Sequence, residues 1–578
     1  MEEEKRDVLI FFAVSVLIMV GYSYFFPNSM VSQPQQQVMS VANNTVNENS
    51  NTGNSQVDFK NGISEYIEKF WNARSSGKLE KVHLNSERLS GEILSKAVKI
   101  NNIFLKGYVD DKGKRISLFG SDSDNYFALT DWISDDKNVF TPDADTNWDV
   151  SGTELSEESP ITFSWDNQRG LLFEKKVSVD ENFVITIENK VKNYGEQTVN
   201  LKLRSIIHRE FLKNSEDAWT FYNGPLGYIN GKLEEISYKD IVEENKIAHQ
   251  THGGWFGITD KYWLVAFIPN QNANCKILYK HSAAGEKNIY EIENFEDEIS
   301  LAPSQEVVNV QHLFVGAKEI KTLDMYEDKL GVKHFDLAID FGWLYILTKP
   351  LLYALAYIKD LVGNMGVGIL LLTLLIKILL FPLANKSYRS MNRMKEIQPK
   401  IQEIQRKYAN DKVRLGQEVS NLYKKEQVNP IGGCLPTLLQ SPILFALYKV
   451  LYISIEMRQA PFIFWIHDLS LPDPMYILNL FGLIPIDLPG FLQIGILPIL
   501  MGFTMYLQQK MGPAPADPSQ ASMMLIMPIM FTVMFAQLPS GLILYWTFSY
   551  VLAMGQQYLI TKIDENRKQK EIEAKAKK

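Results

Sequence analysis

One lysine lies inside a long apolar segment of this sequence. Lys377 belongs to the run Leu370–Phe381, in which Thr373 is the other polar residue. A cation within an apolar membrane helix costs about 2.5–3.5 kcal/mol on insertion scales and usually marks a functional site. Lys377 also lies five residues before Pro382, about 7 Å along a helix, so its stem can extend towards nearby water. A functional charge and a snorkelling lysine both remain open.

Further hydroxyl and amide groups occur in the neighbouring apolar runs. The side chains that carry them are Thr373, Thr437, Gln440, Thr532, Gln537, Thr547 and Ser549. No Asp or Glu occurs within the last five runs, so we expect a water-filled cavity open to the cytoplasm to accommodate Lys377. Each polar group, taken singly, is also explained as a contact between helices.

Methionines are dense near the end of the chain, at positions 501, 505, 511, 523, 524, 527, 530 and 534. Thioether side chains adapt to varied apolar partners. Packing or lipid contact explains any single one of them. As a group, they suit a surface that accepts many unrelated helices.

The remaining chemistry-bearing residues form no recognisable motif. Cys275 and Cys434 lie in different halves of the chain, so we expect neither a disulfide nor a cysteine metal site. The polar half contains His83, His208, His252 and His281. None lies in a nucleophile or metal motif, and no phosphate-binding loop is present. We therefore predict a protein that is not an enzyme and has no cofactor and no metal. The free energy for its work would come from the transfer of apolar substrate surface out of water, at about 25 cal/mol per Å².

The distribution of hydropathy determines the class of protein. Mean hydropathy is −0.12, but residues 28–335 are polar while residues 336–560 contain long apolar runs. Bilayer-spanning helices need about 20 apolar residues. The candidate spans are 8–26, 362–383, 435–453, 491–508, 522–535 and 542–560. The first ends in Phe25-Phe26-Pro27 without a small-residue cleavage site, so we expect an uncleaved anchor.

The charges predict the orientation of these six spans. Residues 382–433 hold eleven Lys/Arg against five Asp/Glu, and residues 562–578 hold seven against four, although the whole chain has a net charge of −8. Cytoplasmic loops are enriched in Lys and Arg. Six spans place both basic segments and both termini in the cytoplasm, and the large acidic domain in the periplasm.

The chain between and beyond the spans divides into further segments. We predict an anchor over 1–27, a flexible linker rich in Gln, Asn and Ser over 28–58 and a β-sandwich over 59–334. Alternation at Phe183, Ile185 and Ile187 is typical of its strands. Short helices are expected near 63–71 and 320–330.

The membrane half also contains non-spanning elements. We predict an amphipathic interfacial helix over 335–346, for which a plain connector is the alternative, a helical core over 347–561 and a basic tail over 562–578. Apolar residues at steps of three and four predict an antiparallel helical hairpin over 384–429, with its turn at Ala409–Asp411.

Three segments resemble the YidC membrane-insertase family, which is related to the inner-membrane insertases of mitochondria and chloroplasts. They are Asn429–Pro436, Arg458–Ser470 and Pro539–Trp546. The resemblance implies a multi-domain membrane protein of six spans, with a five-helix insertase core and a periplasmic all-β supersandwich. It also implies insertion of nascent membrane proteins, with the Sec translocon and the ribosome as partners.

The resemblance also implies which residues line a substrate-binding groove. Lys377 matches a family arginine and keeps the charge without the planar fork. Thr373, Gln440 and Trp546 match further groove positions, and Trp546 stands where tyrosine is common. Residues 479–493 look like an insertion that forms a hairpin at the outer surface.

Insertion of membrane proteins at the bacterial inner membrane, without nucleotide hydrolysis, is therefore the function that we expect. The lipid bilayer is the other partner, and no specific nucleic acid readout is expected. The alternative is a secondary transporter or channel with Lys377 in a polar pathway, although the inverted repeats and intramembrane carboxylates of transporters are not evident. A third possibility is an anchored sugar-binding or sugar-modifying protein. This function would not explain why the chain has five further spans after the anchor.

Overall fold

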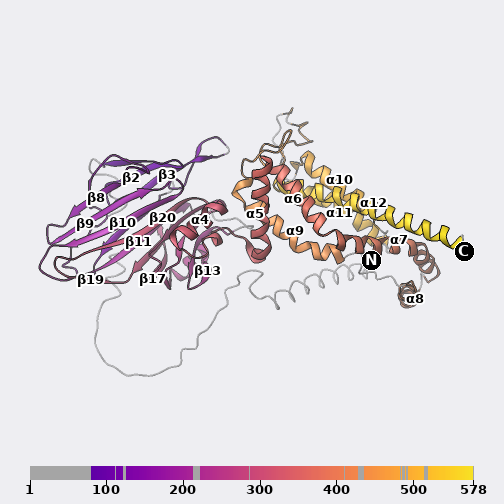
Figure 1. The fold of residues 1–578 in the computed structure, drawn as a ribbon, viewed down its shortest axis with the longest axis horizontal. Coiled ribbons are helices and arrows are strands. Elements are labelled where there is room, and N and C mark those ends of the chain that lie inside the picture. The colour runs from indigo at the N-terminus through magenta and orange to yellow at the C-terminus, as the bar shows by residue number, and fades with distance from the viewer. Residues whose placement is uncertain are drawn as a thin grey trace, which may run out of the picture. The chain divides into compact units, whose positions relative to one another are not determined.

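The computed structural model describes residues 80–576, apart from residues 111, 121–124, 213–221, 285–286, 409–410, 427–434, 482, 485–488, 490–491 and 513–517. The predicted anchor, the linker and the short helix near 63–71 lie outside the described residues. The described chain forms two compact units that meet in sequence between Asp340 and Phe341. Figure 1 shows a β-sheet unit and a helical unit.

The β-sheet unit contains two large sheets. The first has 11 strands, in the order β14 (Lys246–His252), β17 (Asn274–Ala284), β18 (Lys287–Glu296), β11 (Val199–Leu212), β5 (Tyr126–Ile133), β3 (Lys99–Val109), β2 (Leu89–Leu94), β1 (Lys81–Asn85) and β7 (Glu154–Leu155), with β19 (Ile299–Leu301) paired to β11 and β4 (Arg115–Ser117) paired to β3. The second has nine strands, in the order β13 (Lys232–Glu235), β12 (Gly224–Ile229), β15 (Trp255–Thr259), β16 (Trp263–Ile268), β20 (Glu306–Ala317), β10 (Val184–Asn193), β9 (Leu171–Val179), β8 (Ile161–Asp166) and β6 (Asp149–Val150). The pairing of β1 with β7 is parallel, and the long central pairs are antiparallel.

The facing sides of the two sheets enclose the core of this unit. In β10 the alternation predicted from the sequence is present, because Ile185 and Ile187 are buried while Thr186 and Glu188 are partly exposed. Polar contacts also cross between the sheets. Thr130 of β5 donates a hydrogen bond to Asn189 of β10 at 2.7 Å. A unit made mostly of β-sheet is therefore confirmed.

Two helices accompany these sheets. Helix α3 (Tyr238–Glu244) begins at Ser237, whose hydroxyl accepts the Asp240 amide. Helix α4 (Ile320–Leu330) matches the helix expected over 320–330 and ends at Gly331, whose φ of 65° suits glycine.

The structure corrects the amphipathic helix predicted over 335–346. That stretch contains two short 3₁₀ turns, η1 (Phe335–Ala338) and η2 (Gly342–Leu344), and the next helix, α5 (Tyr345–Val362), begins only at Tyr345. Phe335 and Asp336 are buried. The stretch is therefore not one helix: its first turn is packed at Phe335 and Asp336, whereas η2 contains no buried residue.

In the described part of the helical unit, α5 is followed by seven further helices. They are α6 (Met365–Leu379), α7 (Phe381–Lys407), α8 (Lys412–Lys425), α9 (Leu435–Ile453), α10 (Ile496–Lys510), α11 (Pro518–Phe535) and α12 (Ser540–Ala576), with the 3₁₀ turn η4 (Ile455–Met457) after α9. Helix α12 packs against α6, α7, α9 and α10. Among the described helices, none is by itself both long and apolar enough to cross a bilayer, whereas α6 and α7 meet that measure together across a 68° bend.

Helices α7 and α8 pack together, as expected for residues 384–429. Their contact is built from Ile397 and Ile401 of α7, which are buried against Val419, Leu422 and Tyr423 of α8. The Asp411 side chain begins α8 by accepting the amide of Arg414 at 3.0 Å. Spacing of apolar residues was therefore sufficient to predict this element.

The residues on either side of the segment proposed as an insertion pair with each other. An isolated antiparallel bridge joins Tyr476 to Gly495, and Ile477 donates its amide to the carbonyl of Ile494 at 3.2 Å. Leu480 and Leu483 of this segment are exposed, as is Leu478 directly before it. The hairpin expected for residues 479–493 stays a prediction, because several of these residues lie outside the described part of the chain.

Candidate functional site

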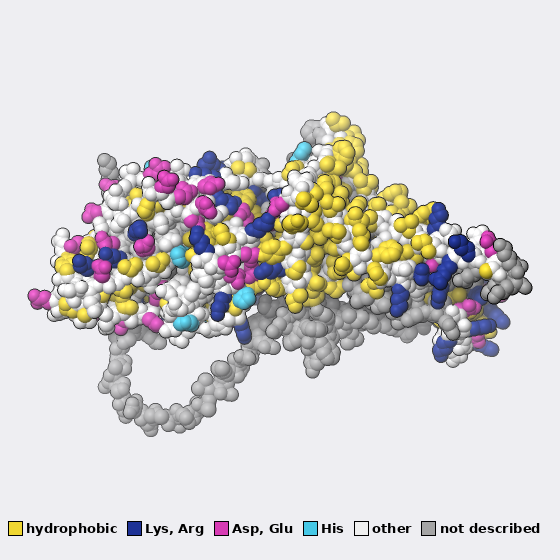
Figure 2. All heavy atoms as spheres, in the orientation of Figure 1, with side chains coloured by type: hydrophobic (Ala, Val, Ile, Leu, Met, Phe, Trp, Pro, Cys, Tyr) yellow, Lys and Arg dark blue, Asp and Glu magenta, His cyan; other side chains and the backbone are white. Residues whose placement is uncertain are grey.

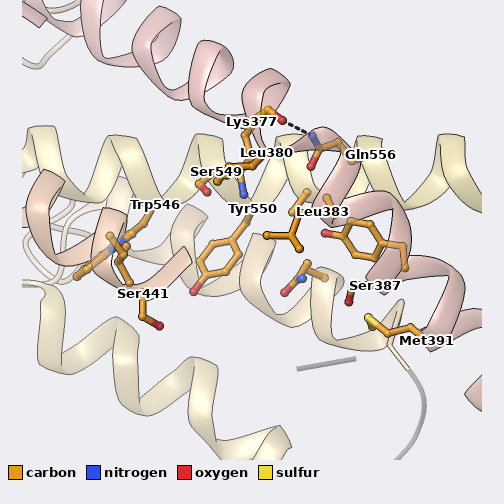
Figure 3. Close-up of a pocket in the computed structure, with 15 residues that line it drawn as sticks. Lys377, Leu380, Leu383, Ser387, Met391, Ser441, Trp546, Ser549, Tyr550 and Gln556 are labelled. Atoms are coloured by element: carbon orange, nitrogen blue, oxygen red, sulfur yellow. Dashed lines mark hydrogen bonds between the residues drawn. The ribbon is translucent and has the colours of Figure 1, made fainter. Parts of the chain in front are cut away.

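A pocket of about 300 Å³ lies among five helices of the helical unit (Figure 3). We call it the Lys377 pocket. Its lining residues are Lys377, Leu380, Leu383, Ala384, Ser387, Tyr388, Met391, Ser441, Leu444, Gln508, Trp546, Ser549, Tyr550, Ala553 and Gln556. They come from α6, α7, α9, α10, α12 and the bend between α6 and α7.

The bend between α6 and α7 positions Lys377. Helix α6 ends two residues later, and Pro382 occupies the first turn of α7, where its missing amide proton is not needed. The carbonyl of Lys377 accepts a hydrogen bond from Gln556 Nε2 of α12 at 3.1 Å (Figure 3). This bond satisfies a carbonyl of the last helical turn and joins the end of α6 to α12.

Consecutive residues at the end of α6 differ strongly in their exposure to solvent. Lys377 is only 9% exposed, whereas Ile378 and Leu379 are 60% and 79% exposed. The turn therefore directs one cation into the Lys377 pocket and two large apolar side chains outward. The end of α6 is therefore a boundary between the pocket, with its polar groups, and an apolar outer surface.

Helix α12 supplies the opposite wall of the pocket. Trp546, Ser549, Tyr550 and Gln556 all line it, and Figure 3 shows the first three facing the same space as Lys377. The Trp546 ring packs against Phe535 of α11 with centroids 4.5 Å apart. This wall combines an anchored aromatic ring with hydroxyl and amide groups.

The chemistry of the lining is that of hydrogen bonding around one cation. Donors and acceptors come from hydroxyls of Ser, Tyr and amides of Gln, and the remainder is largely apolar. The lining residues that the structure describes include no Asp, Glu, His or Cys, so the pocket offers no metal-ligand set. It can hold backbone or acidic groups of a chain while apolar side chains remain outside.

The structure brings together two of the four groove residues expected from the sequence. Lys377 and Trp546 line the same pocket. Thr373 is 2% exposed, is not among the lining residues, and donates its hydroxyl to the Ile369 carbonyl at 2.6 Å. Gln440 lies in α9, but its side chain falls outside the described part of the structure.

Several pocket residues were missed from the sequence. Ser387, Tyr388 and Gln556 lie in segments interpreted as a cytoplasmic hairpin or as the end of a span. Nothing in the local spacing links Gln556 to a lysine 179 residues earlier. For Gln556 the available signal was an amide in an otherwise apolar run, whereas Ser387 and Tyr388 lie beside Lys386 and Arg389 and carry no such signal.

The methionines divide between two environments. Met501 and Met505 of α10 are buried, whereas Met523, Met530 and Met534 of α11 are about half exposed. Only the second group forms part of the apolar surface of the helical unit. A single adaptable methionine stripe is therefore not what the described residues show.

Two family models together match most of this chain. The model described as 60Kd inner membrane protein matches residues 357–569, and the model of the YidC periplasmic domain matches residues 81–354. The chain is 40% identical over 559 residues to the membrane protein insertase YidC of Rickettsia bellii, covering 96% of this chain and 98% of the relative.

One further relative and one solved structure are also similar to this chain. The membrane protein insertase YidC of Rickettsia massiliae is 40% identical over 558 residues, covering 95% of this chain and 98% of that protein. A crystal structure of an active YidC insertase, 16% identical, covers 84% of this chain and 93% of that one with a TM-score of 0.35. The sequence identity across nearly the whole length carries the assignment: the chain belongs to the YidC membrane-insertase family.

Proposed function

We propose that this protein is an insertase that moves hydrophobic segments of newly made proteins into the lipid bilayer, with the Lys377 pocket receiving their hydrophilic parts. The buried cation beside outward-facing Ile378 and Leu379 is the observation that carries this proposal. The relatives named insertases support the same function. No nucleotide is required, because burial of apolar surface in lipid provides the free energy.

The pocket lowers the main cost of insertion. A polar segment that enters hydrocarbon without partners loses several kcal/mol for each unsatisfied backbone group, on the order of 2–7 kcal/mol. Hydroxyls and amides around Lys377 offer replacement hydrogen bonds. The substrate can then move sideways into lipid once its polar end has passed.

Our proposal includes six spans, cytoplasmic termini and a periplasmic β-sheet unit in a bacterial inner membrane. Figure 2 shows Lys and Arg gathered at the end of the helical unit that carries α7, α8 and the C-terminal part of α12. This pattern supports a cytoplasmic position for that end. Interaction with the ribosome at these basic elements, and with the Sec translocon, belongs to the same proposal.

Site-specific photo-cross-linking tests the proposal directly. A photoreactive residue at position 546 or 388 is expected to cross-link to a ribosome-bound chain with a single apolar segment, because Trp546 and Tyr388 line the Lys377 pocket. Position 503 is the matched control, since Phe503 of α10 is 56% exposed on the apolar surface and does not line the pocket. Position 373 tests the groove role still predicted for Thr373.

Insertion itself is scored by protease protection after depletion of the protein. Loss of protection together with cross-links at 546 or 388 supports an insertase with this pocket as its substrate site. Normal insertion after depletion rules out the insertase. Transport of a small solute dependent on Lys377, without cross-links to nascent chains, favours the alternative of a transporter or channel.

A further inference from the structure

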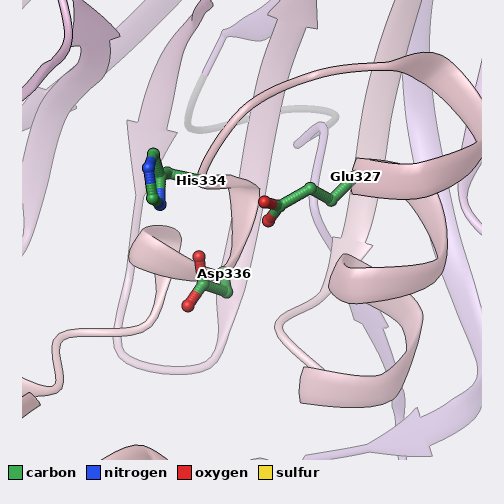
Figure 4. A group of neighbouring side chains, drawn as sticks. All are labelled: Glu327, His334 and Asp336. Carbon is green, nitrogen blue, oxygen red and sulfur yellow. The ribbon is translucent and has the colours of Figure 1, made fainter. Parts of the chain in front are cut away.

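The turn after α4 brings three metal-ligand side chains together in the β-sheet unit (Figure 4). Beyond Gly331 the chain reverses, so that His334 and Asp336 lie beside Glu327 of α4. One ligand atom from each of these three side chains lies within 4.8 Å of the other two. An imidazole nitrogen with two carboxylate oxygens is a donor set that zinc and related transition metals accept.

A buried tyrosine fixes the first ligand. Tyr326, directly before Glu327, is fully buried, and its hydroxyl donates to Asp180 at 2.7 Å while accepting the Phe183 amide at 3.0 Å. Glu327 in turn accepts the amide of Phe335 at 3.2 Å. The helix turn that carries Glu327 is therefore held against the sheet by bonds independent of any ligand.

A buried phenylalanine fixes the other two ligands. Phe335 lies between His334 and Asp336, is inaccessible to solvent, and packs edge-on against Trp255 and Phe314 with centroids 5.3 Å apart in both cases. Anchoring of this residue sets the backbone on either side of it. Ligands held in place by packed neighbours form a preorganised site.

Charge gives a reason for an ion at this position. Asp336 is 1% exposed, and a buried carboxylate is stabilised when it coordinates a metal ion. A divalent ion compensates both carboxylates at once, and the imidazole adds a nitrogen ligand. His334 is exposed, so an ion has a path from solvent to the site.

We propose that Glu327, His334 and Asp336 bind one divalent transition-metal ion of the zinc type, which fastens the end of α4 to η1. Zinc bonds of 2.0–2.2 Å in a tetrahedral site place the ligand atoms about 3.3–3.6 Å apart, and the three ligand atoms here lie within 4.8 Å of one another. Water completes the coordination. The ion stabilises the last segment of the β-sheet unit and takes no part in insertion.

Titration of the full-length protein with zinc tests this site. The protein is purified in detergent without a histidine tag, stripped with a chelator and titrated with ZnCl₂ by calorimetry, and bound metal is counted by mass spectrometry after dialysis. We expect one zinc per chain and a melting temperature that rises with zinc concentration. Manganese and calcium are titrated in parallel, and calcium is expected to bind more weakly because it prefers oxygen ligands.

Four variants locate the ion. Glu327→Gln and His334→Ala are expected to weaken zinc binding by about tenfold or more, whereas His334→Cys retains it because a thiolate replaces the imidazole. Asp328→Asn is the matched control, since Asp328 is the exposed neighbour of Glu327 and lies outside the trio. Each variant must keep the circular dichroism of the metal-free protein. The proposal is overturned if stoichiometric zinc binding is absent, or if it persists unchanged in Glu327→Gln and His334→Ala.

Discussion

Lys377 is the residue at which the snorkelling and groove interpretations give different predictions. Its burial beside exposed Ile378 and Leu379 favours a charge that serves the pocket. We expect Lys377→Ala and Lys377→Glu to reduce insertion of a pocket-dependent substrate several-fold, and Lys377→Arg to retain it because the charge remains. Insertion is measured by protease protection in cells depleted of the wild-type protein.

Lys510 is the control for this series. It also ends an apolar helix, α10, but it is exposed and lies outside the Lys377 pocket. Lys510→Ala should therefore leave insertion unchanged. If both Lys377→Ala and Lys377→Glu keep full insertion activity, Lys377 only snorkels to water. The role assigned to this cation in the pocket is then wrong.

Lys175 predicts a pH dependence of stability in the β-sheet unit. It is 2% exposed, and its amino group donates to the Thr130 carbonyl. Burial lowers the pKa of Lys175 to about 8, against a smaller opposing effect of Asp131. Between pH 8 and the unfolded pKa near 10.5 the unfolded chain binds the extra proton, so stability rises with pH in this window.

The variant Lys175→Met tests this sign. It removes a buried ionisable group, so it should unfold at a higher temperature than wild type at pH 7. The difference should shrink as the pH rises from 8 towards 10, by about 1.4 kcal/mol per pH unit at most. Thermal unfolding of both proteins across this range is the measurement, and a constant difference contradicts the titration of Lys175.

The sequence predicts individual site residues only where composition makes them conspicuous. Lys377 was identifiable because it interrupts an apolar run, and the family resemblance pointed to Trp546. Gln556 and Tyr388 were not, because their partners lie on other helices. The trio of Glu327, His334 and Asp336 was missed, and metal binding was not expected, because three ligands at this spacing match no motif and converge only through the turn at Gly331.

At the scale of elements, the close approach of α10 and α11 requires a glycine at position 502. A Cβ atom on Gly502 would lie 2.0 Å from Thr532 Oγ1 and 3.2 Å from the Pro528 carbonyl oxygen. Small residues permit such close approach between membrane helices. Gly502→Ala should displace the Thr532 hydroxyl from its bond to Pro528 and cost about 1–3 kcal/mol.

Gly555 provides the matched substitution in α12. A Cβ atom there would meet nothing within 4 Å, so Gly555→Ala should be neutral or stabilise by about 0.5–1 kcal/mol through helix propensity. Melting temperatures of the two purified variants in one detergent distinguish the effects. Equal melting temperatures would show that α11 shifts freely against α10.

Elements were predictable where local pattern and burial agree. The α7–α8 pair follows from apolar spacing, since Ile397 and Ile401 are the residues that become buried. The helix predicted over 335–346 was wrong, because a helix on a membrane surface and a connector within a fold can share the same amphipathic pattern. Contacts of Phe335 with Trp255 and Phe314 decide between them, and no local pattern encodes those contacts.

At the scale of the whole molecule, the chain joins two units with separate interiors. The β-sheet unit buries Trp255, Tyr279, Tyr290 and Tyr326, and the helical unit buries Tyr545 with the residues around it. A domain with its own core is able to fold alone. The division between the two units falls at Asp340, a few residues after the change in composition near residue 335.

Independent folding of the β-sheet unit is therefore expected. Residues 80–340, produced as a soluble fragment, should show near-UV circular dichroism and one cooperative thermal transition, because both sheets and the contacts between them, such as Thr130 with Asn189, lie inside the fragment. A second fragment that begins at residue 59 tests the predicted domain boundary, and its transition should coincide with that of the first if residues 59–79 add nothing to the core. Dye binding with loss of near-UV signal in both fragments would show instead that packing of this unit depends on the helical part of the chain.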